Sequence, residues 1–187
     1  MIEKVNRKIT GPIANLIKDT YVITPDRVTW SSFIMSGVIA PVMVVFKYYV
    51  GAALFFYLGA LLDSLDGELA RVRGIASKAG ALLDAVLDRY SDAAMLLALS
   101  LVSWSLLTGF FAMLGSFVTP YIRAKGEALG IKKFRNTIGS RDIRCAVISL
   151  MLFLQKPYWA LVIVAVISNI SALDRFLYAY RKLIDVK

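Results

Sequence analysis

Long apolar segments alternate with short polar ones along most of the chain. Most of them approach the length of about 20 residues that a helix needs to cross a membrane. We predict six membrane-spanning helices, at Val28–Phe46, Gly51–Arg71, Lys78–Val102, Leu106–Arg123, Arg144–Gln155 and Tyr158–Leu177. The fifth has the shortest apolar run, so it must begin within the basic segment before it or tilt. The pattern therefore predicts an all-α polytopic membrane protein.

The beginning of the chain follows another pattern. Apolar residues recur at spacings of three and four, with basic residues between them; they are Ile2, Val5, Ile9, Ile13 and Leu16. This period is typical of an amphipathic helix. We expect residues 1–20 to form a juxtamembrane helix at the membrane surface. Packing of the same helix against the bundle is an equally good interpretation.

Composition agrees with the hydrophobic pattern. The chain has 187 residues, of which 58% are hydrophobic, and its mean hydropathy is +0.66. These values exceed those of ordinary soluble domains. The length fits one transmembrane domain over residues 1–187, and no cleavable signal peptide is expected because the first residues lack an apolar core. Histidine is absent, which excludes histidine-based acid–base or metal chemistry, and Cys145 alone cannot form an internal disulfide.

The basic residues indicate an orientation. The net charge is +9, and with six spans and a cytoplasmic N-terminus, 20 of the 22 Lys and Arg residues fall on the cytoplasmic side. Both termini and the active site would then face the cytoplasm, in the cytoplasmic membrane. Aromatic residues mark the opposite interface, namely Tyr48, Tyr49, Trp104, Tyr158 and Trp159. Because the charges lie between apolar segments rather than on one module, we expect no nucleic-acid partner.

Four carboxylates lie inside or beside the second and third predicted spans. Asp63 and Asp66 are three residues apart, and Asp84 and Asp88 are four apart, so each pair occupies one helix face. A short turn around Gly74 makes the two helices antiparallel neighbours, which lets the pairs converge. Four such charges repel one another unless cations neutralise them, and oxygen ligands suit Mg²⁺, Mn²⁺ or Ca²⁺. We predict two divalent cations, Mg²⁺ or Mn²⁺, in a site suited to displacement at phosphorus.

These residues complete the spacing D-x2-D-G-x2-A-R-x8-G-x3-D-x3-D, carried by Asp63, Asp66, Gly67, Ala70, Arg71, Gly80, Asp84 and Asp88. The spacing resembles the signature of the CDP-alcohol phosphotransferases, integral-membrane enzymes of phospholipid synthesis. The resemblance implies that the four aspartates hold the metals and that the enzyme is a homodimer. It also implies a CDP-lipid site at Thr29, Asp66, Gly67, Arg71, Ser77 and Gly80. For Thr29 and Ser77, a role at the start of a helix is an alternative.

A basic segment separates the fourth and fifth spans. Arg141 and Arg144 share one helix face near a predicted N-terminus, where anions are favoured. Arg123 and Lys125 can approach from the neighbouring helix. Such a pocket suits an acceptor that carries its own phosphate, although contact with lipid headgroups explains the same charges. The stretch from Tyr121 also resembles the inositol-phosphate branch of the family, whereas the start of the fifth span departs from the bacterial pattern.

We therefore predict transfer of a phosphatidyl or archaetidyl group from a CDP-lipid to inositol phosphate, with release of CMP. Asp88 is the candidate general base. Two enzymatic alternatives are synthesis of di-myo-inositol phosphate from CDP-inositol, and glycerol 3-phosphate as the acceptor. A non-enzymatic alternative is an ion or proton carrier, which would explain the buried carboxylates but not the fixed spacing of Gly67, Ala70, Arg71 and Gly80.

Overall fold

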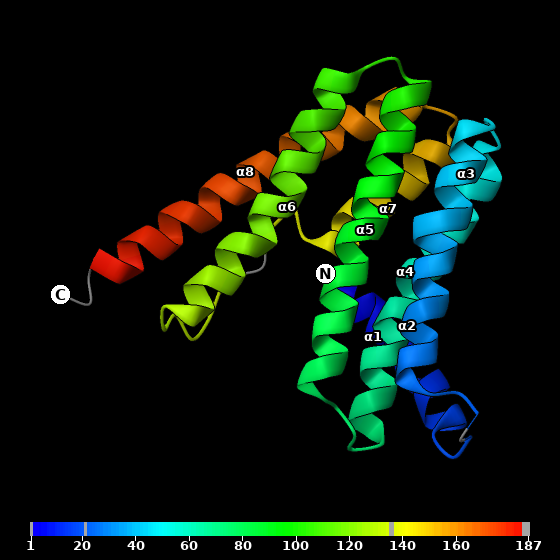
Figure 1. Ribbon diagram of the computed structural model, residues 1–187, viewed down its shortest axis with the longest axis vertical. Helices are drawn as coiled ribbons and strands as arrows, with labels where there is room; N and C mark the ends of the chain where they lie inside the picture. Colours follow the sequence, from blue (N-terminus) through cyan, green and yellow to red (C-terminus); the bar gives the residue numbers. More distant parts are fainter. Residues whose placement is uncertain (1, 21, 135–136, 185–187) are drawn as a thin grey trace.

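Every regular element in the described part of the chain is helical (Figure 1). The structure, a computed structural model, describes residues 2–20, 22–134 and 137–184, with side chains from residue 9 onward. The elements are α1 (Ile2–Ile17), α2 (Pro25–Phe33), the π-helix η1 (Ile34–Ile39), α3 (Ala40–Val45), α4 (Tyr49–Val72), α5 (Lys78–Val102), α6 (Leu106–Ala128), α7 (Arg141–Phe153) and α8 (Pro157–Ile184). The all-α prediction is confirmed.

The first predicted span is one rod made of α2, η1 and α3. Thr24 caps its start by accepting a hydrogen bond from the backbone N–H of Arg27 at 3.3 Å. The rod packs closely on α4, because a Cβ added to Gly59 would lie 2.7 Å from the Cβ of Ser36. The Ser36 hydroxyl also donates to the Ser91 hydroxyl on α5 at 3.2 Å. These contacts fix three elements next to the predicted site.

Among the described residues, two hydrophobic clusters hold the bundle together. The larger one has members on every helix from α3 through α8 and contains fully buried Phe56, Met95, Leu99 and Leu161. The smaller one consists of Ala14, Val28, Leu65 and Leu69, so it attaches α1 to α2 and α4 beside the aspartates. Burial of this apolar surface stabilises a rigid frame around the polar end of the bundle.

Helix α1 is attached to α4 by hydrogen bonds at and just after its C-terminal end. The Arg73 guanidinium, at the end of α4, donates to the backbone carbonyls of Ile17, Lys18, Thr20 and Ile23 at 2.6–2.9 Å. The described members of the predicted apolar stripe do not face the bundle: Ile9, Ile13 and Leu16 are exposed, and Ala14 is buried instead. The described part of the stripe is therefore exposed on the surface of this chain. Ile2 and Val5 lie outside the described side chains.

Four helices in the described residues are long and apolar enough to cross a membrane. They are Pro25–Val45, Tyr49–Val72, Leu106–Ala128 and Pro157–Ile184. Helix α5 has sufficient length but carries five charged residues, and α7 has only 13 residues. The fifth predicted span thus begins and ends earlier than expected, at Arg141 and Phe153, because its first arginines are paired inside the bundle. The fourth span continues past Arg123 to Ala128.

Candidate active site

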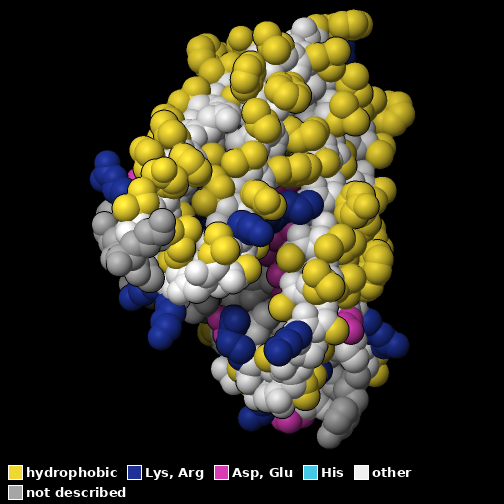
Figure 2. All heavy atoms as spheres, turned by 60° about the vertical axis from the view of Figure 1, so that its left-hand side comes forward, with side chains coloured by type: hydrophobic (Ala, Val, Ile, Leu, Met, Phe, Trp, Pro, Cys, Tyr) yellow, Lys and Arg dark blue, Asp and Glu magenta, His cyan; other side chains and the backbone are white. Residues whose placement is uncertain are grey.

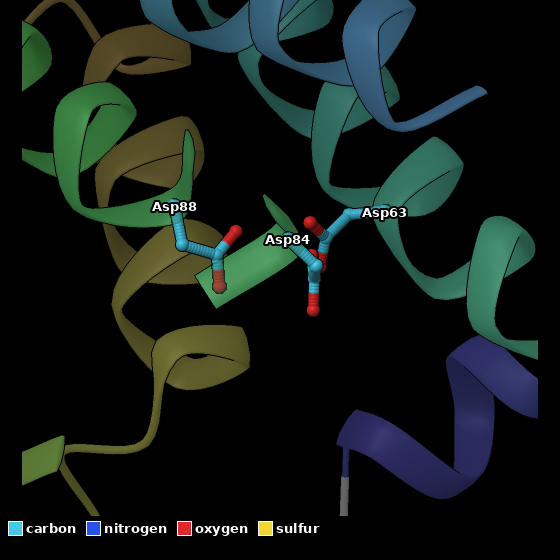
Figure 3. Close-up of side chains that lie close together, drawn as sticks. All are labelled: Asp63, Asp84 and Asp88. Atoms are coloured by element: carbon cyan, nitrogen blue, oxygen red, sulfur yellow. The ribbon is translucent and has the colours of Figure 1, made fainter. Parts of the chain in front are cut away.

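Three of the four predicted metal ligands meet at one point. Asp63 projects from α4 and Asp84 and Asp88 project from α5, and one carboxylate oxygen of each lies within 4.8 Å of the others (Figure 3). The two helices are antiparallel neighbours joined by a turn in which Gly74 has a φ of +68°, a conformation that favours glycine. Asp63 therefore converges with the Asp84–Asp88 pair as predicted, whereas Asp66 is not in this cluster.

This cluster fits a divalent cation. Its three carboxylates are half-buried and close together, so their charges repel one another strongly. In the described part of the chain, the Oδ1 atom of Asp84 is buried without a hydrogen-bond partner. A buried acceptor of this kind is costly unless a ligand satisfies it. Carboxylate oxygens are the ligands that Mg²⁺ and Mn²⁺ prefer.

Asp66 lies one turn beyond Asp63 and is held separately. Its side chain is buried, and its Oδ2 atom accepts a hydrogen bond from the Thr29 hydroxyl at 2.5 Å. Thr29 also donates to the backbone carbonyl of Pro25 at 3.0 Å. The structure thus places Thr29 on Asp66 and fixes the direction of the carboxylate.

A cavity of about 460 Å³ opens beside the aspartates. Figure 2 shows it as a hollow containing acidic side chains, bordered by Lys and Arg and lying below a largely hydrophobic surface. Nine of the predicted site residues line it: Asp63, Asp66, Gly67, Arg71, Asp84, Asp88, Arg123, Arg141 and Arg144. The other four, Thr29, Ser77, Gly80 and Lys125, are not among its lining residues.

The residues predicted for the nucleotide have mixed surroundings. The Arg71 guanidinium is half-exposed and pairs with Glu68 at 2.9 Å. Gly67 faces this guanidinium, and an added Cβ would lie 3.5 Å from Arg71 Nη1, an ordinary contact distance. Ser77 caps α5, since its hydroxyl accepts from the backbone N–H of Gly80 at 2.9 Å. The alternative role of Ser77 as a helix cap is therefore confirmed.

The two arginines that begin α7 contact carboxylates. Arg141 Nη1 lies 2.6 Å from Asp63 Oδ2 and 2.7 Å from Asp88 Oδ1. Arg144 Nη2 lies 2.5 Å from Asp92 Oδ2. Both arginines line the cavity, although Arg144 is only 3% exposed. Arg141 and Arg144 form a cationic wall of the cavity. This cationic wall and the acidic cluster of Asp63, Asp84 and Asp88 therefore form one connected network.

The other two predicted acceptor-site cations are less enclosed. Arg123 lines the cavity and pairs with Glu127 at 2.8 Å, and both side chains are about half-exposed. Lys125 is exposed and does not line the cavity. The basic end of α6 thus contributes its arginine to the cavity, while its lysine lies outside it.

Of the charged residues at the site that were not predicted from the sequence, two are buried. Asp92 is 4% exposed and lies one turn after Asp88; the repeated spacing of four from Asp84 was the available signal. Arg175, on α8, is 7% exposed and lines the cavity. It donates to the Thr119 carbonyl at 3.1 Å, and its Nε is buried without a hydrogen-bond partner in the described residues. A buried arginine in an apolar helix is a signal of function, but in the sequence Arg175 resembles the basic residues that flank a span.

The fold and this site define a helical membrane protein with a carboxylate cluster and a cationic wall on one cavity, an arrangement suited to phosphorus chemistry. Comparison with known proteins identifies the family. A sequence model of the CDP-alcohol phosphatidyltransferases matches residues 22–173, and the chain belongs to this family. The predictions of the family and of a phosphotransferase enzyme are confirmed.

The relatives with assigned names include an archaetidylinositol phosphate synthase and a bifunctional transferase. The archaetidylinositol phosphate synthase of Pyrococcus horikoshii is 29% identical over 188 residues, covering 98% of both chains. The bifunctional IPC transferase and DIPP synthase of Rubrobacter xylanophilus is 35% identical over 161 residues, which cover 83% of this chain and 37% of that protein. The chain thus spans nearly the whole of the first relative but about a third of the second.

Solved structures share the fold. The phosphatidylinositol phosphate synthase PgsA1 of Mycobacterium tuberculosis with CDP-DAG bound has a TM-score of 0.78 and 25% identity, covering 92% of this chain and 94% of that one. The same protein in complex with manganese and citrate has a TM-score of 0.72 and 26% identity, covering 91% and 88%.

Proposed function

We propose that this enzyme transfers the phosphatidyl or archaetidyl group of a CDP-lipid to inositol phosphate and releases CMP. The observation that carries the proposal is the position of Arg141, which joins the acidic cluster to the cationic wall of the same cavity. A phosphate-bearing acceptor on that wall would lie beside the group to be transferred. The names of the Pyrococcus and Mycobacterium proteins support inositol phosphate as the acceptor.

Two divalent cations, Mg²⁺ or Mn²⁺, would be held by Asp63, Asp66, Asp84 and Asp88. The proximity of three of these carboxylates supports this ligand set, and so does the complex of the Mycobacterium protein with manganese. When bound, the cations would neutralise the pyrophosphate and the departing CMP. Thr29 would contribute by keeping the Asp66 carboxylate in position.

The donor would lie over the motif residues of α4 and the start of α5. Gly67 and Arg71 line the cavity and would approach the cytidine diphosphate. Ser77 and Gly80 would shape the same end through the start of α5. The lipid tails would remain in the bilayer beside the exposed apolar surface.

The acceptor phosphate would bind on the other wall of the cavity, with Arg123, Arg141 and Arg144 as ligands and Lys125 at the entrance. The alcohol hydroxyl of the acceptor would attack the lipid-linked phosphorus, and the bond from that phosphorus to CMP would break. Asp88 would accept the hydroxyl proton or orient the hydroxyl. Its Oδ1 atom lies 2.7 Å from Arg141 Nη1, which supports placing it between the two substrates.

The proposed arrangement in the cytoplasmic membrane has six spans, with both termini and the cavity on the cytoplasmic side. The strong bias of basic residues supports this orientation. Helices α5 and α7 would span as members of the bundle, since their charged residues, apart from the exposed Lys78 at the start of α5, line the cavity or pair with one another. We propose a homodimer as the assembly, on the resemblance to the family.

Acceptor-dependent CMP release tests the proposal. Purified enzyme would receive Mg²⁺ and a CDP-lipid, then inositol phosphate, glycerol 3-phosphate, serine or free inositol singly. Release with inositol phosphate alone is the expected result. Release only with serine or free inositol would overturn the phosphate-bearing acceptor, and release only with glycerol 3-phosphate would replace the inositol.

A second candidate activity is condensation of CDP-inositol with a soluble inositol phosphate. The name of the Rubrobacter relative favours it, although this chain spans only 37% of that protein. CDP-inositol in place of the CDP-lipid tests it directly: product formation with CDP-inositol and none with CDP-lipid would make this the principal activity. The ion-carrier alternative has no support, because the chain belongs to a transferase family.

A further inference from the structure

A fifth aspartate, outside the family spacing, contacts the two arginines of the cationic wall. Asp92 lies one turn beyond Asp88 on α5 and is 4% exposed. Its Oδ2 atom is 2.5 Å from Arg144 Nη2, and its Oδ1 atom is 3.9 Å from Arg141 Nε. Asp92 does not line the cavity, whereas both arginines do. It therefore stands behind them.

Arg144 is held from two sides. Its Nη1 atom donates to the backbone carbonyl of Gly139 at 2.7 Å, and its Nη2 atom contacts Asp92. Gly139 is itself fixed to α8, because its N–H donates to the Ser171 hydroxyl at 2.6 Å and an added Cβ would lie 2.7 Å from the Ile167 carbonyl oxygen. The guanidinium thus has a defined direction, and Arg144 lines the cavity.

Charge balance explains why an extra carboxylate is required. Arg141 and Arg144 are neighbours on one helix face and repel each other, and a buried arginine without a partner is costly. The close partners of Arg141 are Asp63 and Asp88, which belong to the proposed cation ligands. A cation on those carboxylates would compete with the guanidinium for the same oxygen atoms. Asp92 is not part of the three-carboxylate cluster, so its charge stays with the arginines.

We propose that Asp92 is a positioning residue for the acceptor: it orients Arg144, and supports Arg141, toward the phosphate of the incoming alcohol. This inference rests on the proposed function, because it deepens the account of how the acceptor is bound. A purely structural ion pair between α5 and α7 would have a different signature. Loss of such an ion pair would lower the stability of the fold and weaken the binding of both substrates together. Loss of a positioning residue instead weakens the binding of the acceptor selectively.

The test compares Asp92→Asn with Ser91→Ala. The control removes the buried Ser91–Ser36 hydrogen bond on the same helix without touching either arginine. We expect Asp92→Asn to raise the acceptor KM by about 10- to 100-fold, the size of effect seen when a residue that holds a metal ligand in place is replaced, with the donor KM nearly unchanged. Ser91→Ala should leave both values close to wild type. An unchanged acceptor KM, or equal rises in both KM values, would overturn the inference.

A double variant tests the route through Arg144. If Asp92 acts through this arginine, Asp92→Asn should add little to the acceptor KM in an Arg144→Gln background. If each substitution raises the acceptor KM by its own factor and the two factors multiply in the double variant, that route would be contradicted. If Asp92→Asn alone does not fold, the double variant, which leaves no unpaired buried charge, is compared with Arg144→Gln: the two should bind the donor and the acceptor equally, and weaker acceptor binding by the double variant would overturn the route through Arg144.

Binding measurements separate this inference from the proposed reaction. Titration of inositol phosphate or glycerol 3-phosphate into the protein by calorimetry, without donor, should show weaker binding to Asp92→Asn than to Ser91→Ala. If the wild type binds these anions but releases no CMP from a CDP-lipid, the proposed reaction fails while the role of Asp92 is still measured. If Asp92→Asn binds them as tightly as wild type, the inference fails while the reaction stands.

Discussion

The Nη1 atom of Arg141 lies 2.6 Å from the Oδ2 atom of Asp63, which joins the start of α7 to the middle of α4. The same nitrogen is 2.7 Å from Asp88 on α5. One guanidinium therefore connects three helices at the boundary between the acidic cluster and the cationic wall. Its charge opposes cation binding on one side and favours anion binding on the other.

Replacing Arg141 should move metal and acceptor affinities in opposite directions. In Arg141→Gln we expect Mn²⁺ to bind roughly tenfold more tightly, since a unit charge a few ångströms away is removed, and the acceptor KM to rise. Mn²⁺ titration and acceptor kinetics measure the two effects. Arg123→Gln is the control for the metal effect, because Arg123 is half-exposed and pairs with Glu127 instead. Weaker Mn²⁺ binding in Arg141→Gln would contradict the competition.

Asp88→Asn should abolish turnover while sparing donor binding. The amide cannot accept the hydroxyl proton, and loss of a general base costs about 10²- to 10⁴-fold in rate. Turnover is followed by CMP release and donor binding by calorimetry. Asp19→Asn, at an exposed position outside the cavity, is the charge-matched control. Near-normal turnover in Asp88→Asn would remove Asp88 from the mechanism.

Thr29→Val should weaken cation binding without a change of side-chain shape. The substitution removes the hydroxyl that donates to Asp66 at 2.5 Å, and such a change beside a metal ligand costs about 10- to 100-fold in affinity. Mn²⁺ titration measures it. Ser31→Ala on the same helix is the control, because that exposed hydroxyl donates only to the Arg27 carbonyl. Equal affinities in the two variants would exclude a role for Thr29 at the metals.

Removal of divalent cations should stop the reaction and lower stability. A chelator should reduce CMP release to background, and Mg²⁺ or Mn²⁺ should restore it. Because a ligand that binds only the folded state stabilises it, by about 2.7 kcal/mol at 100 times Kd, Mn²⁺ should also raise the Tm in detergent. The increase should be smaller in Asp84→Asn, which alters one carboxylate of the cluster. Full activity in excess chelator would refute the metal site.

Arg73→Gln should loosen α1. The substitution removes a guanidinium that donates to four backbone carbonyls of residues 17–23. With a net loss of about 2 kcal/mol, the Tm should fall by about 4–8 °C for a chain of this size, and proteolysis near residue 20 should be faster. Lys78→Gln, at an exposed position, is the control. Unchanged proteolysis would mean that the smaller hydrophobic cluster holds α1 by itself.

Periodicity and spacing allowed much of the site to be predicted. Asp63 and Asp88 converge because helical spacing places each pair on one face and a short turn around Gly74 makes the helices adjacent. Helix ends were harder to predict from the sequence: α7 begins at Arg141 because its arginines pair with carboxylates on other helices. Such long-range pairs leave no local signal. The site role of Arg175 was not predicted for the same reason, since its burial depends on the packing of α8 against α6.

The sequence by itself determined the family, the helical membrane character and the four motif aspartates, because hydrophobic period and residue spacing are local properties of a helix. Only the tertiary structure decided which charges contact one another. It placed Arg141 on two motif carboxylates, Thr29 on Asp66, and Asp92 behind Arg144. The physical reason is that a buried charge takes whichever opposite charge the packing brings within reach, and that choice depends on helices far apart in the sequence.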